Sequence, residues 1–237
     1  MVHAIRVALI ALSLGSCALG EDEAPDYRYR LTVEVETPEG LRSGSSVIEV
    51  QQTLVRAGSS PANQAVERRV RGEAVAVDLP GGKTLFALLR SKNDVDWASL
   101  VFPNLAPQRK GEPFADQLDN VLEVTGTQVL PRMWPPRLYV PKSEAYPLMV
   151  SFEDETDPTT VTMIKPDEFA AAFGRGVVLK RVTVELTDDP VTTGLEARLP
   201  WVTRHIGTLV YRPRDLPIGE MPLEHRLNSS DFMRKGN

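Results

Sequence analysis

Apolar and polar residues alternate with a period of two in two long stretches of the chain. The apolar positions of residues 27–37 are Tyr27, Tyr29, Leu31, Val33 and Val35. Residues 177–187 show the same alternation, with a predicted common face of Val178, Lys180, Val182, Val184 and Leu186. Because successive side chains of a strand point to opposite faces of a sheet, both stretches predict β-strands with one buried face.

Shorter apolar runs between turn-forming residues predict further strands. Residues 46–55 follow the turn Pro38-Glu39-Gly40 and are expected to pair antiparallel with residues 27–37. Two further hairpins are expected, one from residues 73–79 and 84–89 and the other from residues 146–152 and 159–164. Residues 97–102 are expected to form an isolated strand.

Helical patterns are brief. Residues 114–122 carry apolar side chains at helical spacing, and residues 167–173 lie between Pro166 and Gly174, which are typical helix boundaries. The chain is therefore predicted to be mainly β, an antiparallel sandwich-like fold with one or two short helices. An α+β fold is the alternative.

One continuous domain is expected over residues 27–212. The loop 103–113 contains proline and glycine and is the best candidate for a boundary within it. Residues 131–141 contain too many prolines for a central strand, although residues 137–140 fit a sheet edge. Apolar residues become sparse after this domain, so residues 213–237 are expected to form a loosely ordered tail.

The first 16 residues have the layout of a cleavable signal peptide. Arg6 precedes the apolar run 7–14, and the small residues Gly15 and Ser16 follow it. A helix that spans a bilayer needs roughly 18 to 20 apolar residues, and this run is much shorter. We therefore expect export and removal of residues 1–16, without a transmembrane anchor.

The sequence Leu14-Gly15-Ser16-Cys17 resembles the lipobox of bacterial lipoproteins. The resemblance covers only the leader, and it implies cleavage before Cys17 and acylation of that residue. Cys17 is the single cysteine of the chain, so acylation would also protect an unpaired thiol in an oxidising compartment. The alternative is ordinary secretion with cleavage after residue 20.

The same resemblance implies a location. Residues 17–26 are acidic and lack apolar periodicity, which predicts a lipidated N-terminus followed by a tether. The lipid would attach the protein to a membrane, with the folded part facing the periplasm. Ala18, rather than Asp, follows Cys17, and in lipoproteins of enteric-type bacteria this favours the outer membrane over the inner one.

Charge and motif spacing argue against several classes of partner. The chain has 27 Lys and Arg against 32 Asp and Glu, whereas nucleic-acid binding depends on clustered basic residues, so no nucleic-acid partner is expected. Gly82-Lys83-Thr84 matches the end of a phosphate-binding loop, but Val77 stands where that motif requires Gly.

Catalytic and metal-binding residues are scarce. After leader removal only His205 and His225 remain, and Cys17 carries the lipid, so neither a Cys/His zinc site nor a cysteine nucleophile is expected. His205 has no partner that the sequence can name, which favours a surface or packing role. No cofactor and no metal are predicted.

Acidic turns and aromatic residues provide the remaining candidates. The turns 153–158 and 188–190 are rich in carboxylates but lack the ligand spacing of a tight calcium loop, so ordinary strand connections are favoured over a calcium site. Aromatic rings could line a groove for a sugar or peptide, although core packing is favoured. These rings belong to Trp97, Trp134, Tyr139, Tyr146, Trp201 and Tyr211.

Two functional hypotheses follow. The first is a lipid-anchored envelope protein that acts as a non-catalytic binding or structural module for a protein, a peptide or a wall component, through a sheet edge or loops. The second is a periplasmic hydrolase whose carboxylates meet only in the fold. Its candidate residues are Asp154, Asp157, Glu185 and Asp188.

Overall fold

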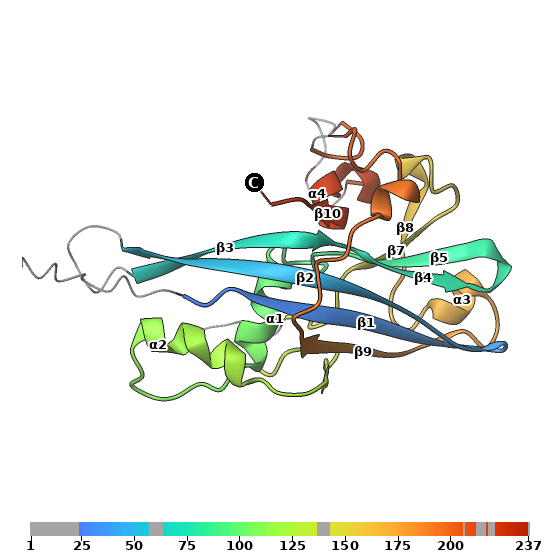
Figure 1. Ribbon diagram of the computed structural model, residues 1–237. Coiled ribbons are helices and arrows are strands. Elements are labelled where there is room, and N and C mark those ends of the chain that lie inside the picture. Colours follow the sequence, from blue (N-terminus) through green and yellow to red (C-terminus); the bar gives the residue numbers. More distant parts are fainter. Residues whose placement is uncertain are drawn as a thin grey trace, which may run out of the picture.

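Antiparallel β-structure dominates the protein, as predicted. The computed structural model describes residues 24–56, 64–136, 143–205, 207–211, 217 and 221–236. Within these residues the strands form one sheet of six strands and one of four, and the α-helices are short (Figure 1). No helix in the described ranges has the length and apolar character needed to cross a membrane.

The six-stranded sheet is built around a long hairpin of β1 (Tyr27–Thr37) and β2 (Gly40–Arg56). The register runs from Tyr27 opposite Val50 to Thr37 opposite Gly40. Gly40 has a φ of 114°, which side chains disfavour, so glycine suits this tight turn. The predicted hairpin is confirmed, and β2 begins earlier than expected.

β9 (Val178–Leu186) pairs antiparallel with β1 on the other side, but the predicted common face of β9 is wrong at one end. Arg181 lies opposite Glu34 and Leu179 lies opposite Val35, so Lys180 is an extra residue in a β-bulge. The bulge places Leu179 against the core and leaves Val178 exposed. Only the part of the face beyond the bulge, with Val182 and Val184, is buried.

Three further strands complete the order β10-β3-β2-β1-β9-β6. They are β3 (Gln64–Glu73), β6 (Gln128–Val129) and β10 (Met233–Arg234). The sequence pattern did not predict β3, because charged residues interrupt it and few apolar side chains alternate. Pairing with the long β2 determines its conformation, from Glu49 opposite Arg71 to Arg56 opposite Gln64.

The four-stranded sheet has the order β4-β5-β7-β8 and contains both other predicted hairpins. Its strands are β4 (Val75–Leu79), β5 (Lys83–Ala87), β7 (Met149–Phe152) and β8 (Val161–Met163). Short 3-10 turns η2 (Pro80–Gly82) and η4 (Pro158–Thr160) connect them.

Both faces of this smaller sheet are buried. Leu85 and Ala87 of β5 contribute to the core shared with β1, whereas Phe86 contributes to a second core with C-terminal residues. This explains why residues 84–89 form an almost continuous apolar run instead of an alternating one. The sheets approach closely where Gly44 of β2 meets the Ala76 carbonyl of β4.

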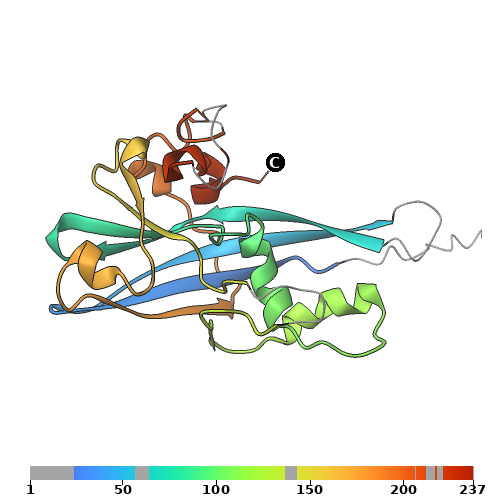
Figure 2. The same ribbon diagram turned by 180° about the vertical axis from the view of Figure 1, so that it is seen from behind.

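Residues 97–102 were predicted as a strand, and this prediction is wrong. They form α1 (Trp97–Leu105), a helix that lies against one face of the six-stranded sheet (Figure 2). Trp97, Val101 and Phe102 recur at helical spacing and are buried. The Tyr29 hydroxyl donates a hydrogen bond to the Ala98 carbonyl oxygen at 2.8 Å, which joins helix and sheet.

The other helices agree better with expectation. α2 (Phe114–Asp119) continues into the 3-10 turn η3 (Asn120–Glu123) and covers the predicted segment. α3 (Phe169–Phe173) starts two residues after the predicted position and ends before Gly174 as expected. The possible edge strand at 137–140 lies outside the described residues.

The C-terminal residues 221–236 contradict the prediction of a loosely ordered tail. Leu227 and Phe232 are almost completely buried in the second core, and α4 (Ser229–Phe232) leads into β10. The Ala74 amide donates to the Phe232 carbonyl oxygen at 2.7 Å, and the Leu89 amide donates to the Asp231 carbonyl oxygen at 2.8 Å. A few well-placed apolar side chains hold this segment, and their low number concealed it in the sequence.

Candidate binding pocket

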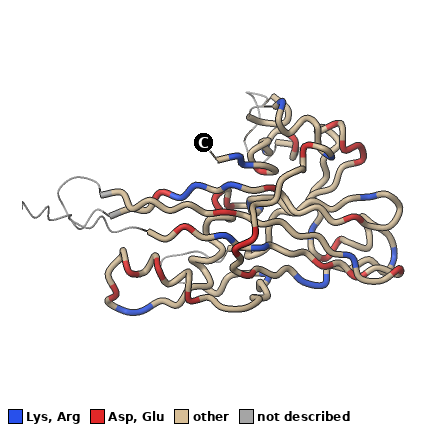
Figure 3. The backbone as a smooth tube through the Cα atoms, in the orientation of Figure 1, with Lys and Arg blue, Asp and Glu red and all other residues tan. Residues whose placement is uncertain are grey.

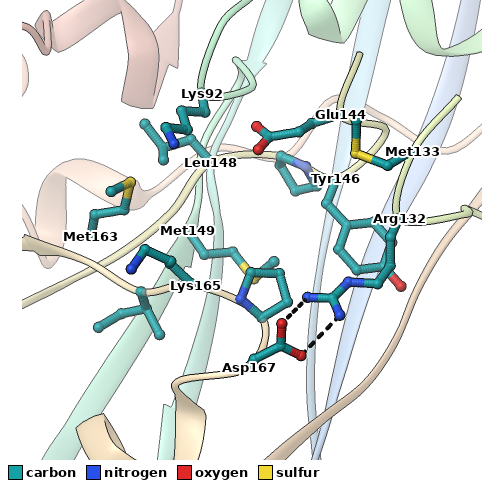
Figure 4. Close-up of a pocket in the computed structure, with 13 residues that line it drawn as sticks. Lys92, Arg132, Met133, Glu144, Tyr146, Leu148, Met149, Met163, Lys165 and Asp167 are labelled. Atoms are coloured by element: carbon teal, nitrogen blue, oxygen red, sulfur yellow. Dashed lines mark hydrogen bonds and ion pairs between the residues drawn. The ribbon is translucent and has the colours of Figure 1, made fainter. Parts of the chain in front are cut away.

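The principal pocket among the described residues has a volume of about 400 Å³ and lies beside the β7–β8 hairpin (Figure 4). Four chain segments meet there. Its lining consists of Lys92, Arg132, Met133, Glu144, Tyr146, Pro147, Leu148, Met149, Met163, Ile164, Lys165, Pro166 and Asp167. The volume is in the range of small-molecule sites.

Backbone hydrogen bonds fix the segments that form the pocket. The Leu148 amide donates to the Arg90 carbonyl oxygen at 2.7 Å, and the Ile164 amide donates to the Met149 carbonyl oxygen at 2.9 Å. The Ala145 amide donates to the Arg132 carbonyl oxygen at 3.2 Å. The pocket is therefore built on the four-stranded sheet and on a loop that this sheet holds in place.

Apolar side chains provide most of the lining surface. Leu148, Met149 and Ile164 are buried, and Met133 and Met163 are half-buried. Methionine is unbranched and polarizable, so these side chains can adapt to ligands of different shape. Three of the six methionines of the chain line this pocket, which is the one signal in the sequence that could have indicated it.

One ion pair lies at the pocket margin, between Arg132 and Asp167. The guanidinium donates to both carboxylate oxygens, with distances of 2.8 and 2.7 Å (Figure 4). These hydrogen bonds raise the pKa of Arg132 and lower that of Asp167. Lys165 forms a separate pair with Glu168 at 2.6 Å, so both cations are compensated by the protein itself.

Two other charged side chains of the lining are uncompensated. Lys92 and Glu144 form no ion pair with each other or with any other described residue. Lys92 is exposed and Glu144 is half-buried. The neighbouring Tyr146 is half-buried, and burial raises the pKa of its phenol.

The candidate carboxylates of the hydrolase hypothesis do not converge on this pocket. Asp154 and Asp157 lie in the turn between β7 and β8, whereas Glu185 is in β9 and Asp188 follows it, on the other sheet. Asp154 accepts hydrogen bonds from the Thr156 amide and hydroxyl, both at 2.8 Å, and these lower its pKa. A general acid needs the opposite shift.

The other members of this set also have local partners. Asp157 caps η4 by accepting from the Thr159 amide at 2.9 Å. Glu185 accepts from the Thr127 hydroxyl at 2.7 Å. Within the described part of the chain, no group of three or more His, Cys, Asp and Glu residues is placed to hold a metal ion.

Most of the candidate aromatic residues belong to the core. Trp97, Trp134 and Trp201 are buried, and Tyr146 alone of the described members lines the pocket. Tyr211 is 74% exposed, and Tyr139 lies outside the described residues, as does Cys17. His205 is exposed, and the His225 ring contacts the Tyr211 carbonyl oxygen at 2.7 Å.

Sequence reasoning missed two buried acids, and both hold the fold together. Glu73 accepts hydrogen bonds from the Gly194 and Leu195 amides at 3.2 and 2.8 Å. Asp231 accepts from the Asn228 amide at 2.8 Å and faces Arg90. Burial raises the pKa of each carboxyl. Neither residue lines the pocket, so we assign them structural roles.

A second pocket, of about 300 Å³, lies between α1, α2 and the middle of β3. Of its two charged residues, Arg109 is paired with Glu123 at 2.6 Å and with the Asn120 side chain at 2.6 Å, whereas Arg68 donates a hydrogen bond to the neutral Gln52 side chain at 3.0 Å. The lining is more polar than that of the first pocket, and its Arg109 is already neutralised by the protein. We therefore regard the pocket beside Arg132 as the better candidate site.

Comparisons with known proteins provide no family. No family model matches the chain, and searches of curated proteins and of solved structures return no match.

Proposed function

We propose that this protein is a lipid-anchored envelope protein that acts as a non-catalytic binding module, and that the pocket beside Arg132 is its binding site. The observation that carries the proposal is a preformed, largely apolar pocket with a few charged side chains, which is the usual composition of a small-ligand site. The described candidate carboxylates lie apart from it, which favours binding over hydrolysis.

The anchor rests on the leader, in which Leu14-Gly15-Ser16-Cys17 resembles a lipobox. The folded part begins a few residues later. Its start is held by the Gln52 amide, which donates to the Asp26 carboxylate at 2.8 Å, and by the Gln52 side chain, which donates to the Pro25 carbonyl oxygen at 2.9 Å. The anchor would therefore keep the N-terminal end of β1 close to the membrane.

One side of the pocket, at Asp167, lies toward the other end of the molecule. α3, which begins two residues after Asp167, lies beside the end of β1 that is distant from the N-terminus (Figure 1). β1 has 11 residues, which span about 36 Å at roughly 3.3 Å per residue. A lipid on Cys17 would thus keep the Asp167 side of the pocket at a distance from the membrane. Acidic and basic residues are interspersed along the described part of the chain (Figure 3).

The anchor is tested by expression in a Gram-negative host and mass spectrometry of the mature N-terminus. We expect an acylated Cys17 in the membrane fraction, with density-gradient separation placing it in the outer membrane, and release of the Cys17→Ala variant. A soluble, unacylated wild-type protein would show instead that the chain is secreted.

The pocket is tested with N-phenyl-1-naphthylamine, a neutral apolar probe whose fluorescence rises when it leaves water. We expect saturable binding to the wild type and its loss in Met163→Trp, because a large ring at this half-buried lining position fills the cavity. Leu122→Trp adds the same ring at a position that is 50% exposed and serves as the control. Equal binding by all three proteins would refute a ligand site in this pocket.

A further inference from the structure

The charges of the pocket define a ligand class more narrowly than its apolar lining does. This inference rests on the proposed binding function of the same pocket. Of the charged lining residues, Arg132 is neutralised by Asp167 and Lys165 by Glu168. The described lining therefore offers a ligand one uncompensated cation, Lys92, and one uncompensated anion, Glu144.

Both side chains lie at the same end of the pocket, opposite the Arg132–Asp167 pair (Figure 4). An anionic ligand would satisfy Lys92 but would meet the Glu144 carboxylate without a countercharge, and a cationic ligand would have the reverse problem. Like charges held close together in a partly apolar site repel each other strongly. A ligand that carries both charges at one end satisfies both side chains.

The rest of the ligand must be apolar. From the charged end, the lining continues over Leu148, Met149 and Met163, none of which has a polar group that a hydrogen-bonding substituent could use. A hydroxyl or amide placed there would lose its hydrogen bonds to water without replacement. Flexible methionines would accept several aliphatic or aromatic shapes in the same space.

The geometry points to an α-amino acid with an apolar side chain as the ligand of this pocket. Its carboxylate would bind Lys92, its ammonium group would bind Glu144, and its side chain would cover the methionine-rich floor. In an α-amino acid the carboxylate and the ammonium group are attached to the same carbon atom, so the ligand has no net charge. Lys92 and Glu144 together have no net charge either.

The test compares three compounds that share one ring, by isothermal titration calorimetry at pH 7. L-Phenylalanine carries both charges, 3-phenylpropionate lacks the ammonium group, and phenethylamine lacks the carboxylate. We expect each single-charge compound to bind about tenfold more weakly, because it loses one charged hydrogen bond to the lining.

Two variants assign each charge to its partner. Lys92→Gln should bind L-phenylalanine and phenethylamine equally, and Glu144→Gln should bind L-phenylalanine and 3-phenylpropionate equally. The controls Lys110→Gln and Glu153→Gln change exposed residues of the same types outside the pocket and should leave all affinities unchanged. Urea midpoints close to wild type would show that each variant is folded.

Each contrary result has a defined meaning. Equal or tighter binding of 3-phenylpropionate would identify an anionic amphiphile as the occupant, and equal or tighter binding of phenethylamine would identify a cation. A fourth compound, the dipeptide Phe-Phe, holds its two charged groups farther apart; a tenfold preference for it over L-phenylalanine would overturn the inference of a single amino acid. If none of the three compounds binds while the naphthylamine probe does, the amino-acid inference is wrong but the pocket remains a ligand site. If the probe also fails, the proposed binding function itself is refuted.

Discussion

Replacement of Phe232 by alanine tests how strongly the C-terminal residues contribute to the fold. The ring is fully buried. Its centroid lies 5.1 Å from that of Trp201, in an edge-to-face arrangement, and 5.8 Å from that of Phe152. Burial and two aromatic contacts place Phe232→Ala among the costly core truncations, which destabilise by about 3–5 kcal/mol.

This loss would be a large fraction of the free energy of unfolding, which is only about 5–15 kcal/mol for a typical domain. Urea unfolding followed by tryptophan fluorescence measures it, since Trp201 touches the deleted ring. With a slope of about 2 kcal/mol per molar urea, the midpoint should fall by about 2 M.

The control is Tyr211→Ala, which removes an aromatic ring that is 74% exposed and preserves the backbone carbonyl that His225 contacts. Exposed substitutions usually change stability by less than about 0.5 kcal/mol. A Phe232→Ala midpoint as close to wild type as that of Tyr211→Ala would refute the conclusion that this segment belongs to the core.

Three further predictions concern the sheets, a buried acid and the pocket margin. Gly44→Ala should destabilise the protein by about 1–3 kcal/mol, because the added Cβ would overlap the Ala76 carbonyl group; a urea midpoint no lower than that of the exposed control Ser45→Ala would contradict this close approach. Burial raises the pKa of Glu73, so the contribution of this residue is fully present below its unfolded pKa of about 4.3 and is lost as the pH rises through the folded pKa. The unfolding free energy of the wild type relative to Glu73→Gln should therefore fall with rising pH across that window, and a rise would show the opposite shift. Arg132→Gln should leave the urea midpoint unchanged because its ion pair with Asp167 is largely exposed, and a clear drop would show that the pair is structural.

Several elements could be predicted because their patterns are local. Apolar and polar residues alternate without interruption in β1. In each of the three hairpins, turn-forming residues separate the two strands, so the local sequence specifies the hairpin. α2 and the end of α3 before Gly174 follow from helical spacing and a terminating glycine in the same way.

The errors have a shared physical cause, which is that contacts distant in sequence decided the outcome. Residues 97–102 are apolar enough for a strand, but the face of β1 that carries Tyr29 is covered by a helix. β3 forms because β2 offers it a long partner, and the bulge at Lys180 becomes visible only when β9 is aligned with β1.

The sequence by itself determined the alternating strands and their hairpins, because each is encoded by neighbouring residues. The tertiary structure decided the rest. It brought Lys92, Arg132, Glu144 and Asp167, which come from separate segments, around one apolar pocket, and it placed the candidate carboxylates of the two acidic turns on different sheets. A binding site of this kind has no local pattern, since its residues become neighbours only when the two sheets and their loops pack together.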